Sequence, residues 1–238
     1  MVAAEPAEQS ALRITPGRKL RCLALHSWRT SASIFQQQLA RARLQDKLSD
    51  LLDIVFIDAP HLASGPIPDD VLPYFEGPYH EWVTAEETPV GVEFDLKKIT
   101  TSHHFIVSTM RKHGPFDCVM GFSQGSVLTA ALVAMQLAGK MPSDIPPLKC
   151  CILFAGMKSR YSAHAAAMVK AVTLPSLHIW GEKDFLRKHC EELAEAFLNP
   201  VVLIHKRGHV IPPLEGAQLA VMRAFLASFL PSNSPSKL

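Results

Sequence analysis

The sequence predicts an α/β protein built on a mostly parallel central sheet of about six strands, with helices on both faces. Short apolar runs bounded by turn residues alternate along the chain with longer segments whose apolar residues recur at helical spacing. With 48% hydrophobic residues, the 238-residue chain has enough apolar material for one large core. We therefore expect a single domain over residues 1–238.

Six apolar runs have the length and composition of strands that are buried on both faces. They are residues 19–25, 52–57, 118–122, 149–155, 176–180 and 201–205. Helical patterns separate them at residues 34–48, 98–112, 124–138, 186–197 and 214–230. Alternation of this kind is typical of right-handed βαβ units, which give a parallel sheet.

Residues 60–96 interrupt the alternation and are predicted to be an insert over one edge of the sheet. This stretch contains six prolines, and its aromatic residues include Tyr74, Phe75, Tyr79 and Trp82. It is too long and too apolar to be a passive connection. The two ends of the chain, residues 1–18 and 231–238, are expected to be flexible.

The charge balance bears on possible partners of the protein, and the cysteine content bears on the state of its thiols. Lysine and arginine number 24 against 22 aspartate and glutamate residues, and no basic run is present, so nucleic acid is not an expected partner. The five cysteines are odd in number, and four of them lie in apolar runs, which indicates buried reduced thiols.

The N-terminal sequence contains Glu5 and Glu8 and lacks the apolar segment of a secretory signal. The longest apolar helical stretch, residues 127–138, is well short of the ~20 residues that a bilayer requires. We therefore expect no membrane span and a cytoplasmic location. The oligomeric state is left open.

A candidate nucleophile lies between a predicted strand and a predicted helix. Residues 121–125, Gly-Phe-Ser-Gln-Gly, match the pattern Gly-x-Ser-x-Gly, follow the strand at 118–122 and open the helix at 124–138. In that context the serine sits on a sharp turn that exposes its hydroxyl above the sheet, and flanking glycines avoid clashes with neighbouring backbone. Ser123 is the predicted nucleophile.

A serine nucleophile requires a base and an acid, and both follow in the order that α/β-hydrolases use. Asp184 comes after the strand at 176–180, and His209 comes after the strand at 201–205. Glu182, in the same turn as Asp184, is the alternative acid. Asp58 and Asp144 are less favoured because one follows an earlier strand and the other lies in a proline-rich loop.

Two backbone N–H groups are expected to form the oxyanion hole, which stabilises negative charge on the substrate oxygen. One belongs to Gln124, directly after the nucleophile. By position the other belongs to Trp28, in the loop after the first strand, with His26 packed beneath the loop.

Several segments together resemble the FSH-type serine hydrolases, over about residues 19–230. They are Leu23 to Ser31, the strand end Phe56-Ile57-Asp58-Ala59-Pro60, Gly77-Pro78-Tyr79-His80-Glu81-Trp82, Gly114 to Asp117, the serine turn, and Gly208-His209-Val210-Ile211-Pro212. The Asp-Ala-Pro strand end and the Tyr-x-x-Trp insert are the most specific of these. Ser27 stands where glycine is usual, a difference that affects the oxyanion loop.

The resemblance implies an α/β-hydrolase fold with a Ser123, Asp184 and His209 triad. It also implies a carboxylesterase or thioesterase acting on acyl substrates. We expect an ester or thioester of an apolar acyl chain as the small-molecule substrate, with Tyr74, Phe75, Tyr79 and Trp82 lining its site unless they only pack the insert. No cofactor or metal is expected, since the sequence lacks nucleotide-binding and zinc-binding motifs. The alternative is a non-catalytic or single-turnover protein that binds a small ligand on a hydrolase fold.

Overall fold

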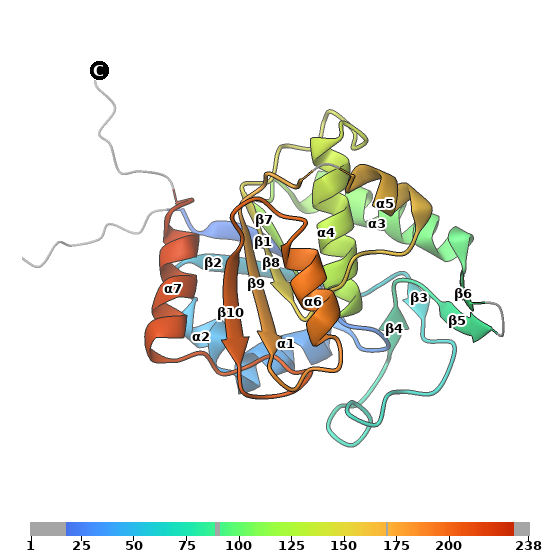
Figure 1. Ribbon diagram of the computed structural model, residues 1–238, viewed down its shortest axis with the longest axis horizontal. Helices are drawn as coiled ribbons and strands as arrows, with labels where there is room; N and C mark the ends of the chain where they lie inside the picture. Colours follow the sequence, from blue (N-terminus) through green and yellow to red (C-terminus); the bar gives the residue numbers. More distant parts are fainter. Residues whose placement is uncertain (1–17, 89–90, 170, 231–238) are drawn as a thin grey trace, which may run out of the picture.

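A computed structural model describes residues 18–88, 91–169 and 171–230. Its centre is a six-stranded parallel sheet with the strand order β10-β9-β8-β7-β1-β2 (Figure 1). The strands are β1 (Leu20–Leu25), β2 (Leu52–Ile57), β7 (Cys118–Phe122), β8 (Cys150–Phe154), β9 (Ser176–Gly181) and β10 (Val201–His205). All six predicted strands are confirmed, with ends displaced by no more than one residue.

The helices of the described residues follow the predicted order, with two differences. They are α1 (Ala32–Arg41), α2 (Leu44–Lys47), α3 (Leu96–His113), α4 (Gln124–Leu137), α5 (Ser162–Ala167), α6 (Arg187–Ala194) and α7 (Gly216–Ala227). The helix expected over 34–48 is divided, because Arg43 adopts a left-handed conformation with φ of 57°. The short helix α5 was not predicted.

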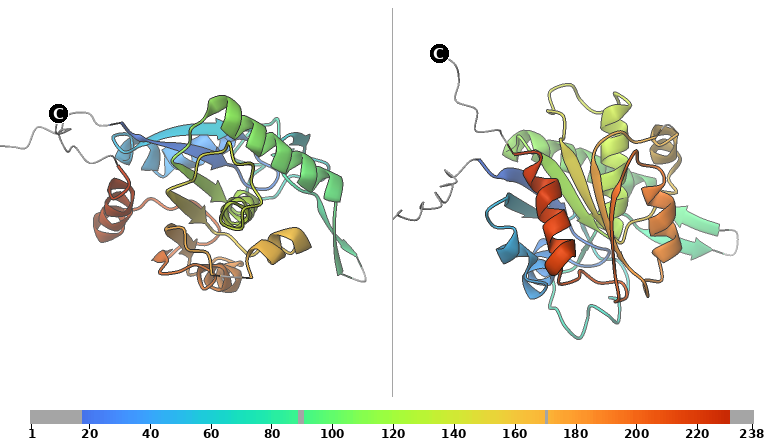
Figure 2. Two further views of the ribbon diagram at one scale, coloured as in Figure 1. Left: turned by 90° about the horizontal axis from the view of Figure 1, so that it is seen from above. Right: turned by 60° about the vertical axis from the view of Figure 1, so that its left-hand side comes forward.

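Helices cover both faces of the sheet, and each face has its own core (Figure 2). On one face, Phe35 and Leu39 of α1 and Met222 and Leu226 of α7 pack against alternate strand residues. On the other, side chains of α3 and α4 such as Ile106 and Leu128 pack against the remaining ones. Burial on both faces explains the nearly continuous apolar runs of these strands.

The five cysteines are free and buried, as expected. Cys22, Cys118 and Cys150 are register neighbours on β1, β7 and β8. The contact with Cys150 lowers the pKa of Cys118, but the contact with Cys22 and burial outweigh it and raise that pKa well above its usual value. The contact with Cys118 and burial raise the pKa of Cys150. Burial raises the pKa of Cys151 well above its usual value and that of Cys190 to about 12.

The insert forms two antiparallel strand pairs that were not predicted. Strand β3 (His61–Leu62) pairs with β4 (His80–Glu81), and β5 (Ala85–Thr88) pairs with β6 (Gly91–Phe94). The loop between β3 and β4 lies beyond the end of the sheet toward which the arrowheads of β9 and β10 point (Figure 1). The insert therefore lies beside the carboxyl ends of the strands, where open α/β folds bind ligands.

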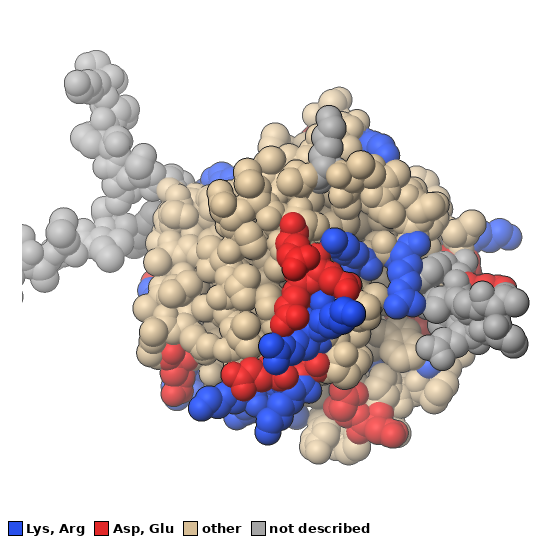
Figure 3. Space-filling view, viewed as in Figure 1, with Lys and Arg blue, Asp and Glu red and all other residues tan. Residues whose placement is uncertain are grey.

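Positive and negative side chains are interspersed on the face shown in Figure 3, consistent with the net charge of +2. Within the described ranges, no helix is both long enough and apolar enough to cross a bilayer. The ends expected to be flexible, 1–18 and 231–238, lie outside the described residues apart from Arg18.

Candidate active site

Ser123 lies on a strained turn between β7 and α4. Its φ of 52° and ψ of −115° place a non-glycine residue in a region that is rarely occupied. A Cβ atom on Gly121 would lie 2.3 Å from the carbonyl oxygen of Gly125, and one on Gly125 would lie 2.0 Å from the carbonyl oxygen of Leu25. The two glycines are required because backbone segments approach each other at both positions.

Asp184 and His209 come together from the ends of β9 and β10. The Nδ1 atom of His209 lies 3.0 Å from each carboxylate oxygen of Asp184, whose side chain is fully buried. The backbone N–H of Leu186 donates to the same carboxylate at 2.8 Å. A neutral imidazole that donates from Nδ1 to Asp184 has its lone pair on Nε2, as a base requires.

Two phenylalanines contact the ring of His209: Phe122 precedes Ser123, and Phe185 follows Asp184. Phe122 stacks on it with ring centroids 5.0 Å apart, and Phe185 lies at 4.6 Å with a tilt of 45°. With Asp184 fixing Nδ1, these contacts fix the orientation of the imidazole.

The other acids considered as partners of His209 lie elsewhere. Glu182 is exposed, Asp58 accepts the backbone N–H of Ala32, and Asp144 forms an exposed ion pair with Arg111. Among the acids weighed from the sequence, the structure brings Asp184 alone into contact with His209.

Ser123 and His209 line one cavity of about 850 Å³. Trp28, Tyr74 and Phe75 line it too, so the loop between β3 and β4 supplies part of its wall. Further apolar lining side chains, which sequence analysis did not identify, are Val71, Phe122, Phe185, Val210 and Ile211. The signal for Phe185, Val210 and Ile211 was available, because each lies within two residues after Asp184 or His209.

Tyr79 and Trp82 are not among the residues that line this cavity. The hydroxyl of Tyr79 donates to the carbonyl oxygen of Phe75 within the loop. Trp82 is 0% exposed, and its indole N–H donates at 2.9 Å to the carbonyl oxygen of His26. The structure thus corrects the expectation of a substrate contact for these two side chains, since both are engaged in packing the insert.

The loop after β1 is supported from below by His26. Its Nδ1 lies 2.7 Å from the carbonyl oxygen of Ser27, and its Nε2 accepts the backbone N–H of Ala59 at 2.9 Å. Burial lowers the pKa of His26 to about 4, so the ring is neutral near pH 7. His26 therefore packs beneath the loop, as expected.

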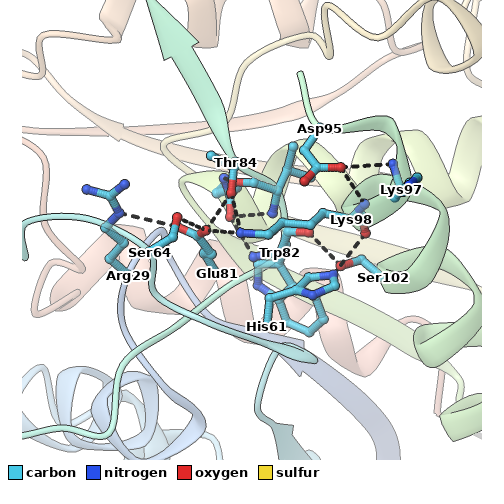
Figure 4. A network of polar contacts seen from close by, with 12 residues as sticks. Arg29, His61, Ser64, Glu81, Trp82, Thr84, Asp95, Lys97, Lys98 and Ser102 are labelled. Atoms are coloured by element: carbon cyan, nitrogen blue, oxygen red, sulfur yellow. Dashed lines mark hydrogen bonds and ion pairs between the residues drawn. The ribbon is translucent and has the colours of Figure 1, made fainter. Parts of the chain in front are cut away.

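Sequence reasoning missed a buried ionic network centred on Glu81 (Figure 4). The Glu81 side chain is fully buried and accepts from Arg29 at 3.2 Å and from Lys98 at 2.8 Å. The hydroxyls of Ser64 and Thr84 also donate to it. Burial by itself raises the pKa of Glu81, but the hydrogen bonds outweigh it and lower the pKa to about 2. Glu81 is therefore ionised near neutral pH.

The sequence profile of the family described as serine hydrolase (FSH1) matches residues 15–221. The chain belongs to the FSH1 serine hydrolase family. This FSH1 chain is 32% identical to Esterase OVCA2 of Xenopus tropicalis, in an alignment that covers 91% of the chain and 97% of that protein. It is 29% identical to Esterase CG5412 of Drosophila melanogaster over 88% of the chain and 74% of that protein.

Solved structures of similar fold include a thioesterase and an esterase. Zea mays acyl-protein thioesterase 2 matches the FSH1 chain with a TM-score of 0.60 and 18% identity, over 92% of the chain and 96% of that structure. Esterase PE8 matches with a TM-score of 0.58 and 20% identity, over 90% and 94%. The α/β-hydrolase fold is thereby confirmed, and it agrees with the membership of the chain in the FSH1 serine hydrolase family.

Proposed function

We propose that the protein cleaves carboxylic esters or thioesters of apolar acyl chains, with Ser123 as nucleophile, His209 as general base and Asp184 as the acid that orients His209. The observation that carries this proposal is the 3.0 Å contact between His209 and Asp184 at a cavity that Ser123 also lines. The strained turn at Ser123 supports it, because such strain occurs where a nucleophile must be exposed.

The reaction proceeds in two halves through an acyl-enzyme. His209 takes the proton of Ser123 as the serine oxygen attacks the carbonyl carbon, and it then protonates the leaving alcohol or thiol. A water molecule that gives its proton to His209 attacks the acyl-enzyme, and His209 returns that proton to the Ser123 oxygen as the acid is released. Throughout, Asp184 stabilises the imidazolium form of His209.

The backbone N–H groups of Gln124 and Trp28 are proposed to bind the oxyanion. Gln124 is the first residue of α4, where backbone N–H groups have no acceptor within the helix and the helix dipole favours negative charge. Trp28 lines the cavity from the loop after β1. Donors placed in advance on both sides of the carbonyl stabilise the transition state more than the substrate.

Tyr74 and Phe75 are the proposed contacts of the acyl chain. Both line the cavity together with Val71 and other apolar side chains. The guanidinium of Arg41 lies 4.3 Å from the centre of the Phe75 ring and donates to the carbonyl oxygen of Tyr74. An apolar wall anchored in this way suits a hydrocarbon chain better than a charged substrate.

Ser123→Ala tests the nucleophile. We expect the variant to remain folded and to lose both labelling by a fluorophosphonate and hydrolysis of an activated ester, because the serine oxygen forms the covalent bond in both reactions. Thermal unfolding of the variant is the control. Retention of most of the wild-type rate would overturn the assignment. Labelling of the wild type without turnover would favour the alternative, a single-turnover binding protein.

Asp184→Asn tests the acid, with Glu182→Gln and Asp144→Asn as matched controls. Loss of the carboxylate that selects the His209 tautomer costs about 10⁴ in kcat in a serine-protease triad, and we expect a fall of at least ~10² here. Both controls should stay near the wild-type rate because their side chains do not contact His209. A large fall in kcat for Glu182→Gln would show that the acid has been misassigned.

A further inference from the structure

We propose that residues 80–84, here called the brace, position the two oxyanion donors relative to each other, with Glu81 and Trp82 as positioning residues. This inference rests on the proposed function, in which Gln124 and Trp28 supply the donors. Tyr79-His80-Glu81-Trp82 is among the most distinctive sequence features of the chain, yet neither Glu81 nor Trp82 lines the cavity.

The brace is attached to the first donor through the side chain of Gln124. The Gln124 Oε1 atom accepts the backbone N–H of Trp82 at 2.9 Å, and its Nε2 donates to the carbonyl oxygen of Val83 at 2.8 Å. Two hydrogen bonds of opposite sense fix both the position and the rotation of the amide. The backbone of Gln124, directly after the nucleophile, is thereby held against the brace.

The same segment is attached to the loop that contains the second donor. The indole N–H of Trp82 donates to the carbonyl oxygen of His26, and the backbone N–H of His80 donates to the carbonyl oxygen of Thr30 at 2.6 Å. These bonds hold the loop on either side of Trp28. Trp82 thus contacts both donor-bearing segments, one through its backbone and one through its ring.

Glu81 holds the loop at the residue next to Trp28 (Figure 4). Arg29 has a φ of 50°, a left-handed conformation that is uncommon for a residue with a side chain. Its guanidinium donates to Glu81 and to the carbonyl oxygen of Pro66, and it stacks 4.2 Å from the centre of the Trp28 ring. These contacts stabilise a strained backbone beside the donor, in a loop where Ser27 replaces the usual glycine.

Lys98 fixes Glu81 from the opposite side. Its ammonium lies 2.8 Å from Glu81 Oε1 and 2.6 Å from the hydroxyl of Thr84, and Ser102 on the same helix donates to the carbonyl oxygen of Trp82. The brace is therefore connected to α3, which packs on the sheet. A buried carboxylate between two cations is costly to displace, because Arg29 and Lys98 would both lose their charged partner.

Misplacing an oxyanion donor should lower the rate of the chemical step while leaving substrate binding nearly unchanged. Removing one donor completely costs about 10² to 10³ in kcat in a serine protease, and a displaced donor loses part of that. Trp82→Phe removes the bond to His26 and keeps most of the side-chain volume. We expect about a tenfold lower kcat with a KM for p-nitrophenyl butanoate within about twofold of wild type.

A trifluoromethyl ketone provides a second readout. The Ser123 oxygen adds to its carbonyl carbon, the carbonyl π electrons move to the oxygen, and His209 takes the serine proton, so the complex carries an oxyanion. Its inhibition constant should rise in Trp82→Phe by the same factor as kcat/KM falls. A purely structural change would lower the unfolding temperature without this parallel loss.

Glu81→Gln tests the ionic centre, and Lys98→Met provides a second variant should the first fail to fold. Each is expected to lower kcat and trifluoromethyl ketone affinity together. Asp144→Asn is the matched control, because it removes a carboxylate that pairs with one arginine on the surface. It should leave both quantities unchanged.

The outcomes separate the brace from the proposed function. Wild-type hydrolysis by Ser123→Ala would overturn both. If Ser123→Ala is inactive but Trp82→Phe and Lys98→Met keep wild-type kcat and inhibitor affinity, the brace alone is overturned. A raised KM at unchanged kcat would likewise overturn it, because it would make Trp82 a substrate contact.

Discussion

The insert contains two neighbouring regions that use aromatic residues in opposite ways. In the loop of residues 63–79, Tyr74 is 62% exposed and lies at the wall of the cavity. In the brace, only a few residues further on, Trp82 is 0% exposed and hydrogen-bonded at its backbone and its ring. One region offers apolar surface to a ligand, and the other is part of the interior.

The difference follows from what each backbone segment pairs with. The brace begins with a strand pair to β3 and a bridge between His80 and Thr30, which turns the following side chains toward the sheet. The part of the loop that contains Tyr74 and Phe75 is attached by Arg41, through the Phe75 ring and the Tyr74 carbonyl oxygen. Residues with few tertiary hydrogen bonds are free to adapt to substrates, whereas the brace has a fixed geometry.

The largest expected difference between the two regions is in stability. Trp82→Ala should lower the free energy of unfolding by about 3–5 kcal/mol, because it leaves a large cavity and removes the donor to His26. Tyr74→Ala should change it by no more than about 0.5 kcal/mol, since the side chain is mostly exposed. Urea unfolding of both variants measures the contrast. Equal losses would show that the loop is as firmly packed as the brace.

Acid should weaken first the support of the loop after β1 and then the brace, in two successive pH ranges. His26 is neutral in the folded protein, with a pKa of about 4 against 6.5 in the unfolded chain, so its contribution is lost as the pH falls from about 6.5 to about 4. Glu81, with a pKa of about 2 against 4.5, contributes above about pH 4.5, and this contribution is lost as the pH falls toward 2. Each shift corresponds to about 3 kcal/mol.

Urea unfolding measured at a series of pH values tests this expectation. Burial also lowers the pKa of His178 to about 4, so the loss in the upper range is not confined to the brace. Glu81→Gln isolates the lower range, because the variant has no carboxylate to protonate there. A wild-type protein and a Glu81→Gln variant with the same pH dependence below about pH 4.5 would contradict the assignment to Glu81.

The smallest effect concerns substrate choice, and it belongs to the loop. If Tyr74 and Phe75 contact the acyl chain, kcat/KM should rise by up to roughly tenfold for each added pair of methylenes, at ~0.8 kcal/mol per buried CH₂. Phe75→Ala should flatten that rise while sparing the acetyl ester. Trp82→Phe should instead lower all rates by a common factor. Parallel profiles for Phe75→Ala and the wild type would remove the loop from the substrate site.

The sheet and the serine turn were predictable because their signals are local in sequence. Each strand is a continuous apolar run, and the turn at Ser123 has its glycines within two residues on either side. The break between α1 and α2 was missed because the left-handed conformation is adopted by Arg43, a residue with no preference for it. Helix α5 was missed because it is only six residues long.

The brace was not predictable because its partners are distant in sequence. Glu81 meets Arg29 across 52 residues, and Trp82 meets His26 across 56. An aromatic residue in a proline-rich segment has the same composition signal whether it lines a cavity or packs under a loop. Tyr74, Phe75, Tyr79 and Trp82 could therefore be identified as important from the sequence. Their division between Tyr74 and Phe75 at the cavity and Tyr79 and Trp82 in the packing of the insert required the structure.

Because the native thiols are buried, a cysteine introduced into the loop of residues 63–79 can be labelled selectively for spectroscopy. All five native cysteines are buried, and those with raised pKa values form even less of the reactive thiolate near neutral pH. A maleimide or nitroxide reagent will therefore discriminate strongly in favour of a cysteine introduced on the surface. The folded protein can be labelled at one chosen position, for instance with Asp70→Cys at the cavity wall, without first removing its own cysteines.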